Sequence, residues 1–94
     1  MPDSLSNTEV QQRFDGLEGW SMVEGKLHKE LVFDDFSAAF GFMTRLALVA
    51  EKLNHHPDWS NSWNTVTIDI VSHAAGGITA GCFELAEAAD RLTA

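Results

Sequence analysis

Three of the four histidines in this 94-residue chain stand where they could do acid/base or metal chemistry. His55 and His56 are adjacent in the stretch EKLNHHPDW, and His73 ends the run TVTIDIVSH. An imidazole exchanges its proton near neutral pH, so it can act as a general acid or a general base. For His55, an ordinary cap at the carbonyl end of a helix is the structural alternative, because that end favours a cation.

A metal site is the weaker interpretation of the same residues. Adjacent histidines cannot easily bind one ion, and the spacings typical of helical or cysteine-rich zinc sites are missing. The sequence has no glycine-rich phosphate loop or activated serine, and its single cysteine, Cys82, has no clear base beside it. His28 lacks a comparable context and is expected at the surface of a strand. The residues alone therefore favour histidine acid/base chemistry without naming a substrate or a metal.

The composition limits the partners of such a site. A formal net charge of −8 disfavours nucleic acid, whose phosphates require a basic surface. One cysteine cannot form an internal disulfide and indicates a reducing compartment. We see no secretory signal peptide and no apolar run of membrane-spanning length. We therefore expect one soluble, cytoplasmic domain over residues 1–94, with 1–5 as a loose end.

The hydrophobic pattern predicts the elements that would position the histidines. In chain order they are a capped helix at 7–17, a hairpin at 20–33 that turns at Gly25, a long helix at 36–53 capped by Asp34 or Asp35, a short strand at 61–63, a strand at 65–72 and a final helix at 78–93. This order, α-β-β-α-β-β-α, predicts an α+β fold. In it, three helices pack on one face of a four-stranded antiparallel sheet.

The end of the long helix is the element closest to the histidines. Pro57 disfavours helical backbone at His56, so the helix must end near Asn54, a residue that tolerates the left-handed conformation. Glu51, four residues before His55, is expected on the same face and could orient it. Because strand ends return to common edges of a sheet, the third histidine could meet this pair.

The long helix is apolar nearly all the way round. Its large apolar residues are Phe36, Phe40, Phe42, Met43, Leu46, Leu48, Val49 and Leu53. One face can bury against the chain's own sheet, and a second subunit is the natural cover for the rest. The alternative is a central helix buried on two sides within one chain, although a chain of this length is short for both covers.

Together these segments resemble the pterin-4a-carbinolamine dehydratase family. The likeness rests on FGFMTRLALVAEKLNHHPDW, Trp63 and VTIDIVSH, and it extends from Trp20 to the final helix. It implies a hydro-lyase that converts 4a-hydroxytetrahydropterin to quinonoid dihydropterin and recycles the pterin of aromatic amino acid hydroxylases. It also implies that no metal or organic cofactor is used. Homodimers or homotetramers would form through the helix 36–53 and the sheet edges.

The resemblance also assigns site residues by position. The catalytic group would be His55, His56 and His73, supported by Glu51. The same three histidines, with Asn54, Pro57, Ser72, Ala74 and Trp20, would bind the pterin. Ala74 replaces a more polar residue of animal members, and the division of acid and base between His55 and His73 stays open.

Two further features follow from the resemblance. The family commonly has aspartate where this chain has Cys82, and an aspartate near a histidine would stabilise the imidazolium. Either Cys82 only packs its helix, or the essential histidine titrates at lower pH here than in relatives. Glu84, two residues further on, is expected to face another way, so it cannot simply replace the aspartate. The alternative function is non-catalytic, as a protein-binding module, since animal members also act as dimerisation cofactors for a homeodomain transcription factor. Because all three histidines are present, we favour the enzyme.

Overall fold

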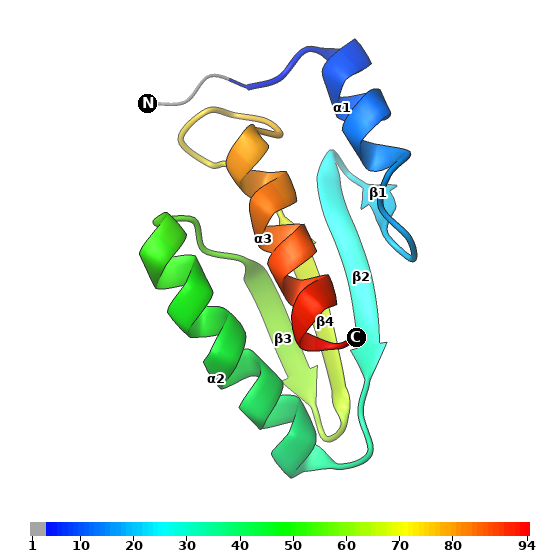
Figure 1. Ribbon diagram of the computed structural model, residues 1–94, viewed down its shortest axis with the longest axis vertical. Helices are drawn as coiled ribbons and strands as arrows, with labels where there is room; N and C mark the ends of the chain where they lie inside the picture. The colour runs from blue at the N-terminus through cyan, green and yellow to red at the C-terminus, as the bar shows by residue number, and fades with distance from the viewer. Residues whose placement is uncertain (1–3) are drawn as a thin grey trace.

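A computed structural model describes residues 4–94, which form helices layered on one antiparallel sheet (Figure 1). The elements are α1 (Asn7–Phe14), β1 (Ser21–Val23), β2 (Lys26–Val32), α2 (Phe36–Leu53), β3 (Asp58–Ser62), β4 (Thr65–Ile70) and α3 (Ala80–Leu92). The predicted α+β class and element order are confirmed. No helix within residues 4–94 is long and apolar enough to cross a membrane.

The four strands pair in the order β1-β2-β4-β3, antiparallel throughout. Side chains alternate between the two faces of a strand, and in β4 the buried set is Val66, Ile68 and Ile70. Figure 1 shows α2 and α3 lying across one face of the sheet, with α1 beyond one end of β2. The other face carries the alternate, polar residues of β4, including Asp69.

The helix boundaries follow the local capping chemistry. Ser6 and Glu9 form the predicted capping box at the start of α1. Of the two candidate caps for α2, Asp35 is the one used, and its carboxylate accepts from Ala38 N at 2.7 Å. Asn54 ends α2 in the left-handed conformation, with φ 52° and ψ 45°, as Pro57 and the asparagine predicted.

Several element ends differ from the sequence prediction. β3 spans Asp58–Ser62 rather than 61–63, β4 ends at Ile70 rather than 72, and α3 spans Ala80–Leu92 rather than 78–93. α1 ends at Phe14 rather than at residue 17, because Gly16 N and Leu17 N bond to carbonyls only three residues back and so leave the α-helical ladder. Of the expected loose end at 1–5, residues 1–3 lie outside the described residues. Leu5 N donates to Ile78 O at 2.7 Å, so Leu5 is tied to the segment before α3.

The core lies between the sheet and the two long helices. α2 contributes Ala39, Phe42, Leu46 and Ala50, and α3 contributes Cys82, Phe83, Leu85, Ala86, Ala88 and Ala89. Phe42 is fully buried, and its ring centroid is 5.2 Å from that of Phe33. Leu92, near the end of α3, is half-buried and packs against the edge of this core. This packing fixes the end of α2, and thereby the histidine pair, against the start of α3.

Candidate active site

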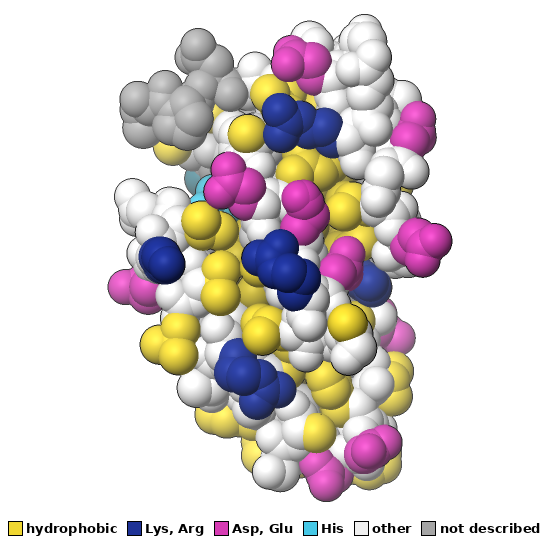
Figure 2. Space-filling model, viewed as in Figure 1, with side chains coloured by type: hydrophobic (Ala, Val, Ile, Leu, Met, Phe, Trp, Pro, Cys, Tyr) yellow, Lys and Arg dark blue, Asp and Glu magenta, His cyan; other side chains and the backbone are white. Residues whose placement is uncertain are grey.

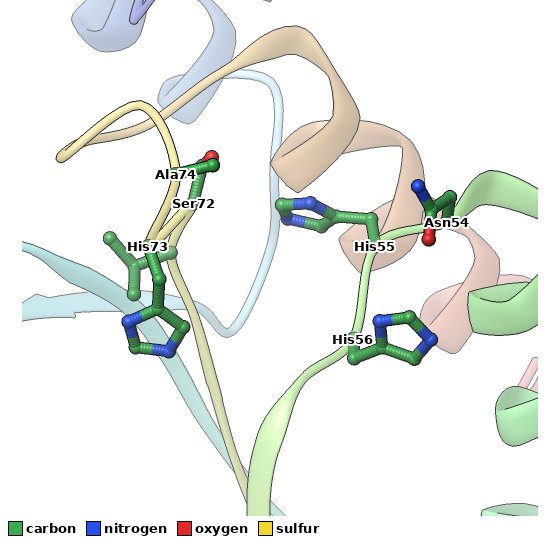
Figure 3. Close-up of a pocket in the computed structure, with 7 residues that line it drawn as sticks. Asn54, His55, His56, Ser72, His73 and Ala74 are labelled. Atoms are coloured by element: carbon green, nitrogen blue, oxygen red, sulfur yellow. The ribbon is translucent and has the colours of Figure 1, made fainter. Parts of the chain in front are cut away.

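The histidines meet at a pocket between the end of α2 and the loop after β4 (Figure 3). The pocket has a volume of about 250 Å³ and is lined by Asn54, His55, His56, Val71, Ser72, His73 and Ala74. It therefore includes all the predicted binding residues except Pro57 and Trp20. The sequence analysis missed Val71, whose only signal is that it directly precedes three predicted residues, Ser72, His73 and Ala74.

The loop that carries His73 is held by its neighbour, Ser72. Ser72 is buried, its N–H donates to Gly77 O at 2.9 Å, and its hydroxyl accepts from Ala75 N at 3.1 Å. Gly76 supplies a φ of 70°, which the return of the chain requires. The Ser72 hydroxyl is thus engaged in shaping the loop that presents His73 and Ala74.

His55 lies against the first turn of α3. A Cβ on Gly81 would be 3.8 Å from both Cγ and Nδ1 of the imidazole. Its Nε2 atom is buried and has no hydrogen-bond partner within residues 4–94. Burial, then the neighbouring His56 and His73, lower the pKa of His55, whereas the Glu84 carboxylate acts in the opposite direction. Because the net effect lowers this pKa, the imidazole stays neutral down to lower pH than usual and can still accept a proton there.

His56 points to the other side of its own backbone (Figure 3). Its Nε2 lies 2.6 Å from Oε1 of Glu51, and both side chains are exposed. The expectation that Glu51 orients His55 is therefore wrong. That expectation assumed a continuing helix, but Asn54 reverses the chain, and His55 N bonds to Ala50 O instead.

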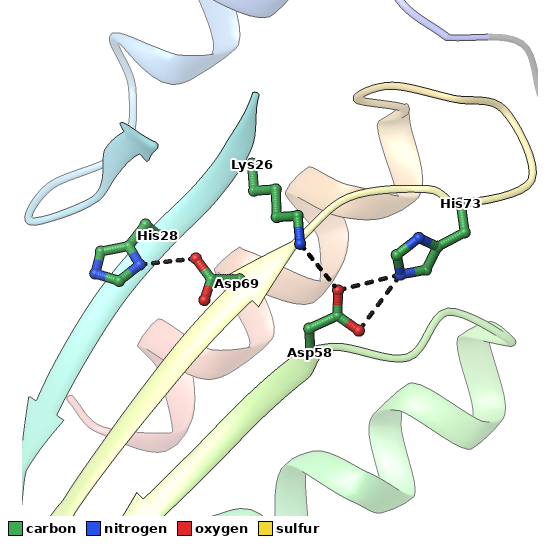
Figure 4. Close-up of polar contacts among 5 residues, drawn as sticks. All are labelled: Lys26, His28, Asp58, Asp69 and His73. Carbon is green, nitrogen blue, oxygen red and sulfur yellow. Dashed lines mark hydrogen bonds and ion pairs between the residues drawn. The ribbon is translucent and has the colours of Figure 1, made fainter. Parts of the chain in front are cut away.

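His73 is bound by a carboxylate that the sequence analysis did not single out. Its Nε2 lies 3.1 and 3.3 Å from the two oxygens of Asp58, the first residue of β3. Lys26 Nζ reaches the same carboxylate at 3.4 Å (Figure 4). The hydrogen bond with His73 is the main cause that lowers the pKa of Asp58. The only sequence signal was the place of Asp58 directly after Pro57, at the start of a strand.

Two predicted residues are not brought to this pocket. Trp20 is buried in the core, and its Nε1 donates to both oxygens of Asp90, at 3.0 and 3.1 Å, near the far end of α3. Lys29 Nζ bonds the same carboxylate at 2.9 Å and lies 5.5 Å from the indole centroid. This cluster places Trp20 away from the histidines of its own chain. Pro57 follows His56 but does not line the pocket.

The start of α3 carries both Cys82 and Glu84. Cys82 is fully buried, and its Sγ accepts from Thr79 N at 3.4 Å, which supports a packing and capping role. Glu84 is three residues after Gly81 and shares its face of the helix, which is the face that His55 contacts. Glu84 does face another way from Cys82, as expected, since Glu84 is exposed and Cys82 is buried. The Glu84 carboxylate nevertheless raises the pKa of His55, which the register counted from Cys82 did not predict.

Glu84→Gln is expected to lower the pKa of His55 further. The change removes the Glu84 charge, which raises this pKa, so protonation of the imidazole would require lower pH. An NMR titration of the His55 ring protons measures the effect. Glu87→Gln is the matched control, since Glu87 is also exposed on α3 but lies one turn further on. An unchanged His55 titration in Glu84→Gln would contradict this account of the electrostatics.

His28 and its partner Asp69 lie outside the pocket. His28 Nδ1 pairs with Asp69 Oδ1 at 2.7 Å, across β2 and β4 on the sheet face opposite the helices (Figure 4). Within the described part of the chain, no three His, Cys, Asp or Glu side chains are arranged to hold a metal ion.

Comparison with known proteins places this geometry in a family. The model of the family described as "Pterin 4 alpha carbinolamine dehydratase" matches residues 3–92. The chain belongs to the pterin-4a-carbinolamine dehydratase family. Members of this family are hydro-lyases. The resemblance drawn from the histidine motif is thereby confirmed.

Relatives match over the full length. A protein of Solibacter usitatus (strain Ellin6076) named "Putative pterin-4-alpha-carbinolamine dehydratase" is 51% identical, covering 100% of this chain and 99% of its own. One of the same name from Rhodopseudomonas palustris (strain HaA2) is 45% identical, covering 98% and 93%. The crystal structure of a "transcriptional coactivator/pterin dehydratase from Brucella Melitensis" superposes with a TM-score of 0.93 at 35% identity, covering 98% of this chain and 100% of that one.

Proposed function

We propose that this protein dehydrates 4a-hydroxytetrahydropterin to quinonoid dihydropterin by general acid/base catalysis. The observation that carries the proposal is that His55 and His73, 18 positions apart and in the loops after α2 and β4, line one pocket. Loss of water needs an acid to protonate the departing 4a-hydroxyl and a base to take a proton from a ring nitrogen. Two histidines on one small pocket supply both groups.

His55 fits the role of base. Its side chain lines the pocket, and its lowered pKa keeps the imidazole neutral. A neutral imidazole carries one nitrogen that accepts a proton. The base takes the proton from the ring nitrogen. The electron pair of that N–H bond then forms the new C=N bond to C4a, while the C4a–O bond breaks.

His73 fits the role of acid. An ionised carboxylate only accepts hydrogen bonds, so the nitrogen that faces Asp58 is the one that carries a hydrogen. Nδ1 is then the nitrogen left for the substrate. In the imidazolium it holds the second proton and can deliver it to the departing hydroxyl, which leaves as water.

The pocket suits a small bicyclic substrate. Its volume of about 250 Å³ lies just below the range of about 300–1,000 Å³ that is common for small-molecule sites. Asn54 contributes a polar side chain to a lining that also holds the apolar Val71 and Ala74. Recycling of the pterin cofactor of aromatic amino acid hydroxylases would be the physiological setting.

The decisive test is a dehydration assay on freshly generated 4a-hydroxytetrahydropterin. We expect the chain to accelerate loss of water, and to do so equally after treatment with a chelator, because two imidazoles supply the proton transfers. Activity that disappears with chelation and returns with zinc would contradict the histidine mechanism. Dehydration no faster than in buffer would contradict the proposed function and favour a non-catalytic binding role.

We also propose that α2 forms part of an interface between copies of the chain. Phe36, Phe40 and Leu48 are 51, 54 and 69% exposed, so the chain itself does not bury this helix on two sides. Figure 2 shows hydrophobic side chains over the surface of α2, interrupted by basic ones. A partner copy that covered them would remove this apolar surface from water.

Sedimentation is expected to show a dimer or tetramer at micromolar concentration. Leu48→Asp should shift the protein toward monomer, because it places a charge on the exposed apolar face while leaving the core of the chain intact. Asn7→Asp adds the same charge to the exposed α1 and should leave assembly unchanged. A monomeric wild-type chain would contradict the proposed interface.

A further inference from the structure

Two histidine–aspartate pairs stand side by side on the sheet face opposite the helices (Figure 4). Asp58 of β3 and Asp69 of β4 are direct cross-strand partners. Asp58 binds His73 at 3.1 Å, and Asp69 binds His28 at 2.7 Å. The pairs have similar chemistry, but only the first includes a histidine that lines the pocket.

Asp58 is itself fixed more firmly than an exposed carboxylate on a loop would be. It begins β3, whose pairing with β4 sets its backbone, and Lys26 on β2 binds Oδ2 at 3.4 Å. Both oxygens face Nε2 of His73, at 3.1 and 3.3 Å. The sheet thus holds a carboxylate at a defined place beside the loop that carries His73.

The His73 ring needs such a partner because it has little other support. Its side chain is 69% exposed, and within residues 4–94 its only side-chain hydrogen bonds are those to Asp58. An exposed imidazole on a loop can rotate among several rotamers, and it pays conformational entropy when it is held in one. A hydrogen bond to a carboxylate fixes the ring orientation and leaves Nδ1 as the free nitrogen.

We propose that Asp58, steadied by Lys26, is a positioning residue that holds His73 in the orientation needed for proton transfer in the pocket. The inference rests on the dehydratase function proposed above. Asp58 does not line the pocket, so it acts on the reaction only through His73. Within residues 4–94, the charged or titratable groups that face His73 are Asp58 from β3, with Lys26 of β2 behind it, and His55 from the end of α2.

The kinetic test compares Asp58→Asn with Asp69→Asn. Each removes one carboxylate from the same sheet face and breaks one pair with histidine, but only the first frees His73. We expect Asp58→Asn to lower kcat about 10- to 100-fold with little change in KM, since misplacing a catalytic group costs rate rather than ground-state binding. Asp69→Asn should keep wild-type kcat, and Asp58→Glu should recover most of the loss. Equal kcat values for Asp58→Asn and wild type would overturn the proposal.

A second arm tests the pair without any activity. In a carbon-detected NMR titration of the carboxyl groups, His73→Ala should raise the pKa of Asp58 back toward its usual range, because His73 is the main cause that lowers it. His28→Ala should leave the Asp58 titration in place. If His73→Ala has no effect, the pair is not formed in solution and the proposal fails. If wild type does not dehydrate the pterin, the proposed function fails, while this titration still decides whether Asp58 holds His73.

Discussion

His55→Ala is expected to lower kcat for dehydration by about 100- to 10,000-fold, and His73→Ala by a similar factor. Each change removes one of the two groups that we assign to proton transfer, the base at the end of α2 or the acid after β4. The rate measured with freshly generated 4a-hydroxytetrahydropterin reports both losses. His56→Ala should cost less, because His56 points away from His73 and is bound to Glu51.

Controls separate chemistry from folding in these variants. None of the three histidines is among the buried residues, so circular dichroism and thermal unfolding should show folds close to wild type. His28→Ala removes a histidine of the same chain outside the pocket and should retain full turnover. If the double variant His55→Ala/His73→Ala turned over at the wild-type rate, the histidines would be structural and another group would have to move the protons.

The sequence predicts the frame of this site because short-range rules govern it. The capping box at Ser6, the end of α2 at Asn54 before Pro57 and the alternation in β4 are each set by residues within a few positions. Strand topology then brings His73 to the edge where α2 ends. Family likeness supplies what these rules cannot, namely the substrate.

The contacts that the sequence did not predict depend on how the chain leaves a helix or on geometry between elements. Glu51 meets His56 because the left-handed Asn54 turns the chain out of helical register. Asp58 meets His73 because β3 and β4 pair antiparallel and leave the start of one strand beside the loop after the other. The link from Trp20 to Asp90 spans 70 positions, and no local pattern encodes it.

In α3, the position of Glu84 along the helix decides whether its charge affects the pKa of His55. Counted from Cys82, Glu84 falls on a different face, and from sequence it could not replace the missing carboxylate. The structure shows that His55 rests on Gly81, so Glu84 acts on it one turn along the helix. The buried thiol of Cys82 meanwhile bonds to Thr79, and within the described residues no hydrogen bond joins it to a histidine.

Phe42→Ala is expected to lower the free energy of unfolding by about 3–5 kcal/mol. The ring is fully buried between α2 and the sheet and packs against Phe33, so truncation leaves a cavity as well as losing apolar burial. Urea unfolding at a fixed chain concentration measures the loss. The concentration must be matched, because assembly of copies adds to the apparent stability of each.

Phe40→Ala is the matched comparison for Phe42→Ala, since it makes the same change two residues earlier on the same helix. Phe40 is 54% exposed and packs on Phe36, with ring centroids 5.7 Å apart, so within one chain its truncation should cost about 1 kcal/mol or less. If copies cover this face, the loss of unfolding free energy caused by Phe40→Ala should grow as chain concentration rises. The difference between the losses caused by Phe42→Ala and Phe40→Ala should then be largest at low chain concentration. Similar small losses for both variants at every concentration would contradict the packing of α2 on the sheet. A large, concentration-independent loss for Phe40→Ala would mean that the chain buries this ring itself and that no second copy is needed to cover it.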